Sequence, residues 1–277
     1  MAPHRLLVPV LALILLGPGC GGSSDGGGGS LTQPSGFLTI NVPADMIKTG
    51  ATQSLTATMT KGGTTQTVTP TWRTDNTAVA TIDASGQLTA VAHGEVTVIA
   101  DHQGMSGTKT VRVVNDYGAT WYGRYVVTNC KATYGAEEAG MCDGDGFAVG
   151  TVFPLGLEFQ QDRDRVTGTL WLGQLNGPFT GSVATAGNLT GECKIAWTVE
   201  GGVIDLRVSP FSILREGDRI PQGTFTVLMT VVGDPGSVTF EASIMGLEKA
   251  TSGRSSLART PAAPRTLRDV PRLMRQM

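Results

Sequence analysis

Three cysteines beyond residue 115 are the side chains of this sequence with the most varied chemistry. Cys130 and Cys142 flank a polar loop that contains glycine, and Cys193 follows in a separate segment. In an oxidising compartment a Cys130–Cys142 disulfide would close about a dozen residues, and a Cys130–Cys193 bond is the alternative. No histidine follows residue 102, so this part of the chain has none to activate a nucleophilic thiol. We therefore predict a structural disulfide and a free thiol.

Two aspartates directly after Cys142 are the best candidates for a metal site. Asp143 and Asp145 alternate with glycines, and carboxylates beside a tight turn suit Ca²⁺. The third acid and the closing glutamate of a twelve-residue calcium loop are absent, so an ordinary turn is the other interpretation. His93 and His102 stand beside turn glycines without a nearby cysteine, which is typical of surface residues. Ca²⁺ on the aspartates is the one cofactor that the sequence suggests.

The remaining polar residues form no recognisable catalytic motif. The sequence lacks His-Glu-x-x-His, Gly-x-Ser-x-Gly, a phosphate-binding glycine loop and Cys-x-x-Cys. Glu158, Glu192, Glu200 and Asp205 could act as a glycosidase pair, but their spacing selects no two of them. Residues 1–250 carry 15 basic and 22 acidic side chains, which argues against a nucleic-acid partner. We predict a protein that is not an enzyme and does not bind nucleic acid.

The amino terminus has the features of an export signal. Residues 1–20 contain a polar start, an apolar run from Leu6 to Leu16 that is too short to cross a bilayer, and small residues before Cys20. This arrangement resembles the lipidation site of bacterial lipoproteins. The resemblance implies that Cys20 is lipidated and anchors the protein in the outer membrane, on its periplasmic or surface face. Gly17-Pro18 departs from the pattern, so ordinary cleavage and secretion is the alternative.

The two segments that flank the body of the chain differ from it in composition. Residues 21–36 are rich in glycine and serine and should form a flexible tether. Residues 249–277 carry six arginines, one aspartate and three prolines, and we expect a disordered tail. The tail is either a solvated end or a segment that attaches electrostatically to anionic lipid or polymer.

Residues 37–115 predict a β-domain. Short runs in which apolar and polar residues alternate indicate strands at 37–42, 53–60, 67–74, 79–82, 87–91, 95–101 and 109–114. Trp72 is the expected anchor of a core between two packed sheets. Trp72, Val79-Ala80-Thr81-Ile82-Asp83, Gly86-Gln87-Leu88-Thr89-Ala90 and the run Gly94–Ala100 resemble the group 2 bacterial Ig-like domains of invasin- and intimin-type surface proteins. The resemblance implies an Ig-like β-sandwich without catalytic residues.

Residues 118–248 predict a second antiparallel β-domain. We expect strands at 123–130, 153–161, 165–173, 177–184, 189–199, 203–213, 223–232 and 237–247, which hairpin-length linkers mostly join. This order favours an eight-stranded up-and-down barrel over a Greek-key sandwich, so the chain is expected to be all-β. A Thr-Gly pattern recurs at 166–170, 179–183 and 189–193 and predicts sharp bends within strands. The opening Trp121-Tyr122-Gly123-Arg124-Tyr125 and the meander resemble barrels of the lipocalin and avidin type.

Such a barrel is either packed with side chains or holds one small ligand. Trp121, Trp171 and Trp197 are the aromatic candidates for ligand binding. Trp171 is out of step with its apolar neighbours and should face outward, where it could stack on a sugar ring or be covered by a loop. The following residues should point inward: Leu155, Leu157, Phe159, Leu170, Leu172, Val183, Ile195, Trp197, Leu206, Val208, Phe225, Val227, Met229, Phe240, Ala242 and Ile244.

Two functions are consistent with these features. The first is a non-enzymatic cell-envelope lipoprotein in which the Ig-like module presents a barrel that binds an envelope polysaccharide or a protein, as in adhesion. The second is a lipocalin-like carrier of a small apolar ligand. A hollow barrel would favour the carrier, and an aromatic platform on the outer face would favour binding of a polymer.

Overall fold

A computed structural model describes residues 36–138, 140–144, 146–199, 202–232, 235–251 and 269–275. The predicted export signal, Cys20 and nearly all of the predicted tether lie outside the described residues, so the structure does not address them. The described part contains eighteen strands and two short helices, neither of which has the length and apolar character needed to span a bilayer.

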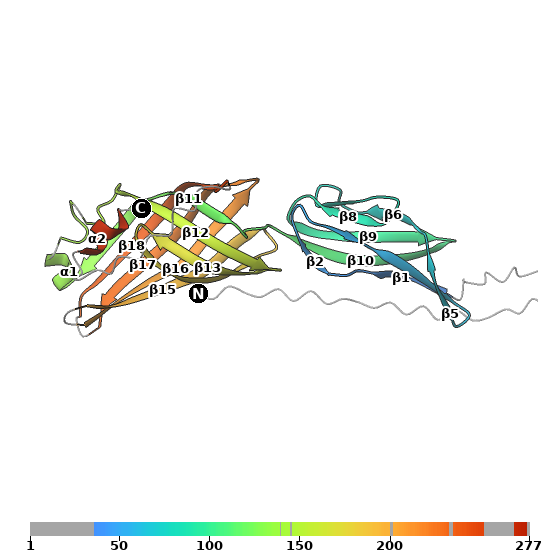
Figure 1. The fold of residues 1–277 in the computed structure, drawn as a ribbon, viewed down its shortest axis with the longest axis horizontal. Coiled ribbons are helices and arrows are strands. Elements are labelled where there is room, and N and C mark those ends of the chain that lie inside the picture. Colours follow the sequence, from blue (N-terminus) through green and yellow to red (C-terminus); the bar gives the residue numbers. More distant parts are fainter. Residues whose placement is uncertain are drawn as a thin grey trace, which may run out of the picture. The chain divides into compact units, whose positions relative to one another are not determined.

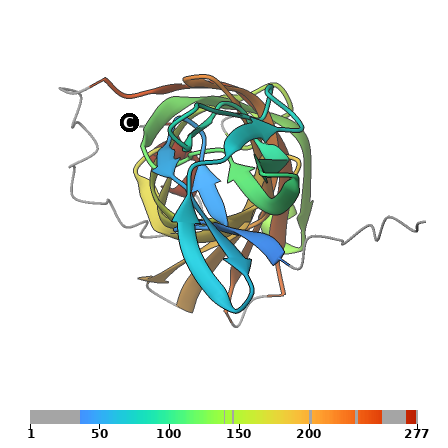
Figure 2. The ribbon, with the colours of Figure 1, turned by 90° about the vertical axis from the view of Figure 1, so that its right-hand side faces the viewer.

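The first ten strands form a β-sandwich around one core (Figure 1). They are β1 (Gly36–Asn41), β2 (Met46–Lys48), β3 (Thr52–Ser54), β4 (Thr56–Lys61), β5 (Thr64–Val68), β6 (Thr71–Thr74), β7 (Ala80–Ile82), β8 (Gln87–Ala90), β9 (Gly94–His102) and β10 (Met105–Val114). They pair as three sheets with the orders β1-β4-β5, β2-β10-β9-β6 and β3-β8-β7. Strands β4 and β5 make a hairpin, shown in cyan in Figure 2, that contributes few buried side chains beyond β4.

The strands of the sandwich differ from the prediction at several points, one of which is the expected strand at 53–60, divided into β3 and β4 of different sheets. The expected strand at 67–74 is divided at Pro70, so that β5 and β6 belong to different sheets. Proline has no N–H to donate to a strand ladder, and the chain crosses from one sheet to the other at this point. Strand β2 was not expected, because three residues are too few to show a period, and it pairs in parallel with β10.

Trp72 is less central than predicted. The core consists of aliphatic side chains such as Leu88, Val98 and Val111, each of which is fully buried. Trp72 lies on β6, the edge strand of its sheet, and is only half-buried. Its indole covers the turn at Gly86, where an added Cβ would come within 3.0 Å of Nε1. The alternating aliphatic residues hold this domain together, and the tryptophan seals its edge.

This arrangement predicts that Leu88 contributes more to stability than Trp72. Leu88→Ala should lower the free energy of unfolding by about 2–5 kcal/mol, because it removes a fully buried side chain from a close-packed core. Trp72→Ala should cost about 1–3 kcal/mol, because part of the indole already contacts water. Urea unfolding of the two variants, followed by circular dichroism, checks the order. A larger loss of stability for Trp72→Ala than for Leu88→Ala would contradict this order and indicate that Trp72 is the main core residue.

The last eight strands close into a barrel in sequence order, as predicted (Figure 1). They are β11 (Thr120–Thr133), β12 (Val152–Asp162), β13 (Arg165–Leu172), β14 (Leu175–Val183), β15 (Asn188–Val199), β16 (Gly202–Glu216), β17 (Arg219–Val231) and β18 (Ser237–Lys249). Every neighbouring pair is antiparallel, and β18 pairs with β11 to complete the ring. The all-β fold class and the up-and-down barrel are therefore confirmed. The strands are longer than expected mainly at β11, β16 and β17, and a tight turn at residues 217–218 joins the last two.

The predicted disordered tail contains a short docked helix, which corrects that prediction. Helix α2 (Asp269–Met274) lies at the same end of the barrel as helix α1 (Gly135–Glu138) (Figure 1). Val270, Leu273 and Met274 are buried, at the i, i+3 and i+4 positions that share one face of a helix. Six residues cannot hold a helix in water alone, so burial of this face stabilises α2. The apolar pattern of α2 is short and is interspersed with arginines, so the sequence did not indicate a helix here.

Candidate functional site

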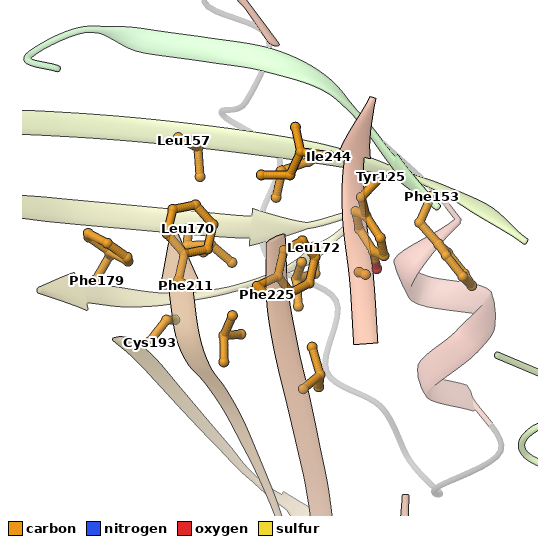
Figure 3. Packing of buried hydrophobic residues seen from close by; sticks show 14 of the residues in the cluster. Tyr125, Phe153, Leu157, Leu170, Leu172, Phe179, Cys193, Phe211, Phe225 and Ile244 are labelled. Carbon is orange, nitrogen blue, oxygen red and sulfur yellow. The ribbon is translucent and has the colours of Figure 1, made fainter. Parts of the chain in front are cut away.

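The interior of the barrel is packed with aromatic rings. Phe159 contacts Phe179, which contacts Phe211, and Phe211 contacts Phe225, with centroid separations of 4.6, 5.2 and 6.0 Å. Tyr125 continues the series from Phe225 at 4.9 Å, and its ring also neighbours Phe153 and Phe240. Figure 3 shows five of these side chains, Tyr125, Phe153, Phe179, Phe211 and Phe225, on different strands of the barrel. All the predicted inward residues are buried except Trp197, which is half-buried. The close contacts favour a packed barrel over one with a ligand cavity.

The recurring glycines make room for one of these rings. Gly181 on β14 pairs with Gly191 on β15, and both lie beside the ring of Phe179. A Cβ at Gly181 would stand 2.9 Å from a ring carbon of Phe179, and one at Gly191 would also collide with the ring. A register shift follows Gly191, so the predicted irregularity of these strands is present. The glycines thus serve the packing of the interior as well as the bend.

Trp121 closes the barrel at the end where β11 begins. It is fully buried, and its Nε1–H donates to the backbone carbonyl of Tyr117 at 3.0 Å. The Tyr117 hydroxyl donates to the carbonyl oxygen of Gly187 (2.9 Å) and accepts from the N–H of Arg215 (3.0 Å). The Arg215 guanidinium lies 5.8 Å from the Trp121 ring centroid. Trp121 is therefore a buried, hydrogen-bonded part of the core at this end of the barrel, and it presents no exposed face to a ligand.

A disulfide and α2 close the opposite end. Cys130 is bonded to Cys142, as predicted, and this bond holds the loop that carries the buried residues Met141 and Phe147. The Phe147 ring stacks on Phe240 with a centroid separation of 4.6 Å. From α2, Arg275 donates to the carbonyl oxygen of Gly146 and lies 5.7 Å from the Phe153 ring centroid. Side chains from distant parts of the chain thus occupy both ends.

The disulfide should be specific and stabilising. Peptide mapping without reduction should recover Cys130 joined to Cys142, and iodoacetamide should label Cys193 only after unfolding, because that thiol is fully buried. Cys142→Ser should lower the free energy of unfolding by roughly 3 kcal/mol, since it releases a loop of about a dozen residues. Recovery of a Cys130–Cys193 peptide would contradict the strand order, in which β11 and β15 are not neighbours.

The predicted calcium site gains little from the structure. Asp143 is exposed, and its carbonyl oxygen accepts a hydrogen bond from the Gly146 N–H at 2.7 Å, as in an ordinary turn. Asp145 lies outside the described residues. Across the described ranges no cluster of three His, Cys, Asp or Glu side chains is arranged to hold a metal ion. Within the described part of the chain no group of ligands completes a site with Asp143, and Ca²⁺ binding stays a prediction.

Trp171 and Trp197 occupy different surfaces. Trp197 follows the inward residues Cys193 and Ile195 along β15 and packs half-buried against the barrel core. Trp171 lies between the buried residues Leu170 and Leu172 and faces the outer side of β13, as its position in the sequence predicted. Its indole is half-buried, and its Nε1 is shielded from water with no hydrogen-bond acceptor in the part of the chain that the structure describes. Trp171 is thus the tryptophan that remains a candidate for binding at the outer face.

Trp171 belongs to a row of outward residues that sequence inspection missed. Residues paired across six successive strands are Arg219 (β17), Glu248 (β18), Tyr122 (β11), Gly156 (β12), Trp171 (β13) and Asn176 (β14), and we call this set the outer row. Two aromatic side chains thus flank a glycine, with polar side chains at both ends. Only the register of the barrel brings these positions together, so no local spacing in the sequence could indicate them.

A hollow of about 560 Å³ adjoins the outer row where β11, β18 and β17 meet. It lies at a β-bulge, because Gly123 pairs with Leu247 while Tyr125 pairs with Ile244. Gly123 and Gly246 form the floor of this hollow, which is low because neither residue has a side chain. A Cβ at Gly123 would collide with the carbonyl oxygen of Gly246, and Gly246 has a φ of 114°, which favours glycine. The residues that surround this floor with side chains include Tyr122, Arg124, Arg219, Pro221, Met245 and Glu248. We call it the bulge hollow.

Comparison with known families bears on the sandwich. Residues 37–113 match the family model of the bacterial Ig-like domain (group 2), as the sequence resemblance predicted. No curated protein matches the chain. The match ends before the barrel, whose likeness to lipocalins and avidins stays a prediction. The sandwich is therefore a bacterial Ig-like domain, and together with the closed barrel it fits a protein of the cell surface or envelope.

Proposed function

We propose that the chain is a non-enzymatic lipoprotein of the cell envelope, in which the Ig-like domain presents a barrel that binds an envelope polymer or a partner protein. The aromatic packing of the barrel carries this proposal. Rings in contact from Phe159 to Phe147 occupy the interior, so a binding surface belongs on the outer face. The two-aromatic outer row provides such a surface. Lipidation at Cys20 would hold the protein at the outer membrane.

A membrane and envelope partition experiment tests both parts. In a bacterial host the wild-type chain should fractionate with membranes, and Cys20→Ser should become soluble. The soluble variant should then co-sediment with isolated envelope fragments and be released when their polysaccharide or surface protein is removed enzymatically. A wild-type protein that is soluble would defeat the anchor. Failure of the soluble variant to sediment with any envelope fraction would defeat the binding function.

A carrier of a small apolar ligand is the second candidate, and one observation favours it. The Tyr125 hydroxyl is fully buried in the barrel and has no hydrogen-bond partner within the described ranges, and burial raises the pKa of this phenol well above its usual range. Unsatisfied buried hydroxyls are costly, and a ligand with one polar atom would satisfy this one. Because aromatic rings pack against Tyr125 where such a ligand would bind, the envelope-binding role is the better supported function.

A further inference from the structure

The outer row has the layout of a stacking platform. Tyr122 and Trp171 stand on β11 and β13, which are separated by one strand, so their positions are about 10 Å apart at the usual strand spacing. Between them Gly156 contributes no side chain. Gly156 is itself buried, so side chains cover the backbone between the two half-buried aromatic residues. Two aromatic side chains at this separation can stack on the sugar rings of two neighbouring units of a polysaccharide.

Polar groups at the ends of the row match hydroxyl-rich ligands. Trp171 Nε1 and Asn176 Nδ2, from cross-strand neighbours, are both donors that are shielded from water and find no acceptor among the described residues. Such donors are destabilising unless something accepts from them, and sugar hydroxyl or carboxylate oxygens would do so after a small side-chain rotation. At the other end Arg219 and Glu248, separated by 3.6 Å, can donate to and accept from hydroxyl groups.

The charge around the bulge hollow selects an acidic sugar. Arg219 is compensated by Glu248, whereas Arg124 is exposed and makes no ion pair within the described part of the chain. A guanidinium presents paired donors that fit a carboxylate. Burial, and then the charge of Glu158, raise the pKa of Tyr122. Glu158 pairs with Thr120 and Arg124 with Pro154, so along β11 they lie on opposite sides of Tyr122. A carboxylate is therefore favoured on the Arg124 side.

We propose that the outer row and the bulge hollow form one binding site for an acidic polysaccharide. Two of its sugar rings stack on Tyr122 and Trp171, and a carboxylate of the chain binds Arg124 in the hollow. The exposed side chain of Met245 and the ring of Pro221 supply apolar contact for the sugar beside that carboxylate. This assignment rests on the proposed envelope-binding function and names the surface and the ligand class that serve it.

Calorimetric titration of the full chain with Cys20→Ser tests the assignment. The ligand is a galacturonate hexamer, and its methyl ester is the matched control without negative charge. The acid should bind, and more weakly at high salt. Trp171→Ala, Tyr122→Ala and Arg124→Gln should each weaken binding about tenfold or more. Two variants serve as controls and should bind like the parent: Tyr134→Ala removes an exposed aromatic away from the row, and Arg207→Gln removes an exposed charge from β16.

The outcomes separate this proposal from the broader one. Equal binding of the acid and its ester would overturn the acidic specificity, and unaltered binding by Trp171→Ala and Arg124→Gln would overturn the site. Thermal unfolding of each variant shows whether a loss of binding is caused by misfolding. Trp171→Phe, which keeps an aromatic ring at this position, is measured in the same way. If neither hexamer binds while the protein still sediments with envelope fragments, this assignment is wrong and the envelope function stands. If sedimentation also fails, the proposed function is wrong.

Discussion

Replacing Phe211 with alanine is expected to lower the free energy of unfolding by about 3–5 kcal/mol. Phe211 is fully buried and connects the ring of Phe179 on one side with that of Phe225 on the other. Its removal would leave a cavity in the middle of the aromatic series, where side chains from three strands are in contact. Neighbouring side chains in such a close-packed interior can move little to fill the cavity. Urea unfolding monitored by far-ultraviolet circular dichroism measures the loss.

Leu228→Ala is the matched control for this measurement. Leu228 lies on β17 like Phe225 but faces outward and is 39% exposed, so its truncation should change stability by less than about 0.5–1 kcal/mol. A loss below about 1 kcal/mol for Phe211→Ala would mean that the barrel interior is loosely filled. In that case the carrier function would become the better proposal, with Tyr125 as the polar contact of the ligand.

The barrel could be predicted from sequence because its strands obey a simple period. On β12, for example, Leu155, Leu157 and Phe159 alternate with outward residues, and short polar turns separate each strand from the next. Hairpin connections leave one natural order for eight such strands, which is the order observed. The Cys130–Cys142 bond followed from the same reasoning, since it closes a loop within a single connection.

The features that sequence reasoning missed depend on contacts between distant segments. Whether a tryptophan in a strand is buried depends on what packs over it, and the guanidinium of Arg215, from the distant strand β16, lies over the ring of Trp121. The outer row depends on the register of five strand pairs, and one of them, β11 with β18, contains a bulge directly after Tyr122. A shift of one residue in the register would move members of the row to the inner face. Helix α2 shows only one helical repeat of apolar residues, too little to distinguish from chance.

Alkaline pH is expected to destabilise the protein partly through Cys193. Burial raises the pKa of this thiol from 9.0 to about 12. The folded chain therefore keeps the proton over a range in which the unfolded chain releases it. Because the unfolded state then binds fewer protons, the free energy of unfolding falls as the pH rises from about 9 to 12. The stabilising contribution is complete below pH 9 and is lost as the pH passes through the folded-state value.

Comparison of the wild type with Cys193→Ala isolates this contribution. Three pKa units correspond to about 4 kcal/mol between pH 8 and pH 12, of which roughly 3 kcal/mol should be lost by pH 11. The variant should be less stable at neutral pH by a constant amount, because it leaves a small cavity, but its stability should decline less steeply with pH. Other groups, including the buried Tyr125, titrate in both proteins and cancel in the difference. Parallel pH profiles of the two proteins would show that the Cys193 thiol ionises in the folded barrel as readily as in the unfolded chain, and that the interior around it admits water.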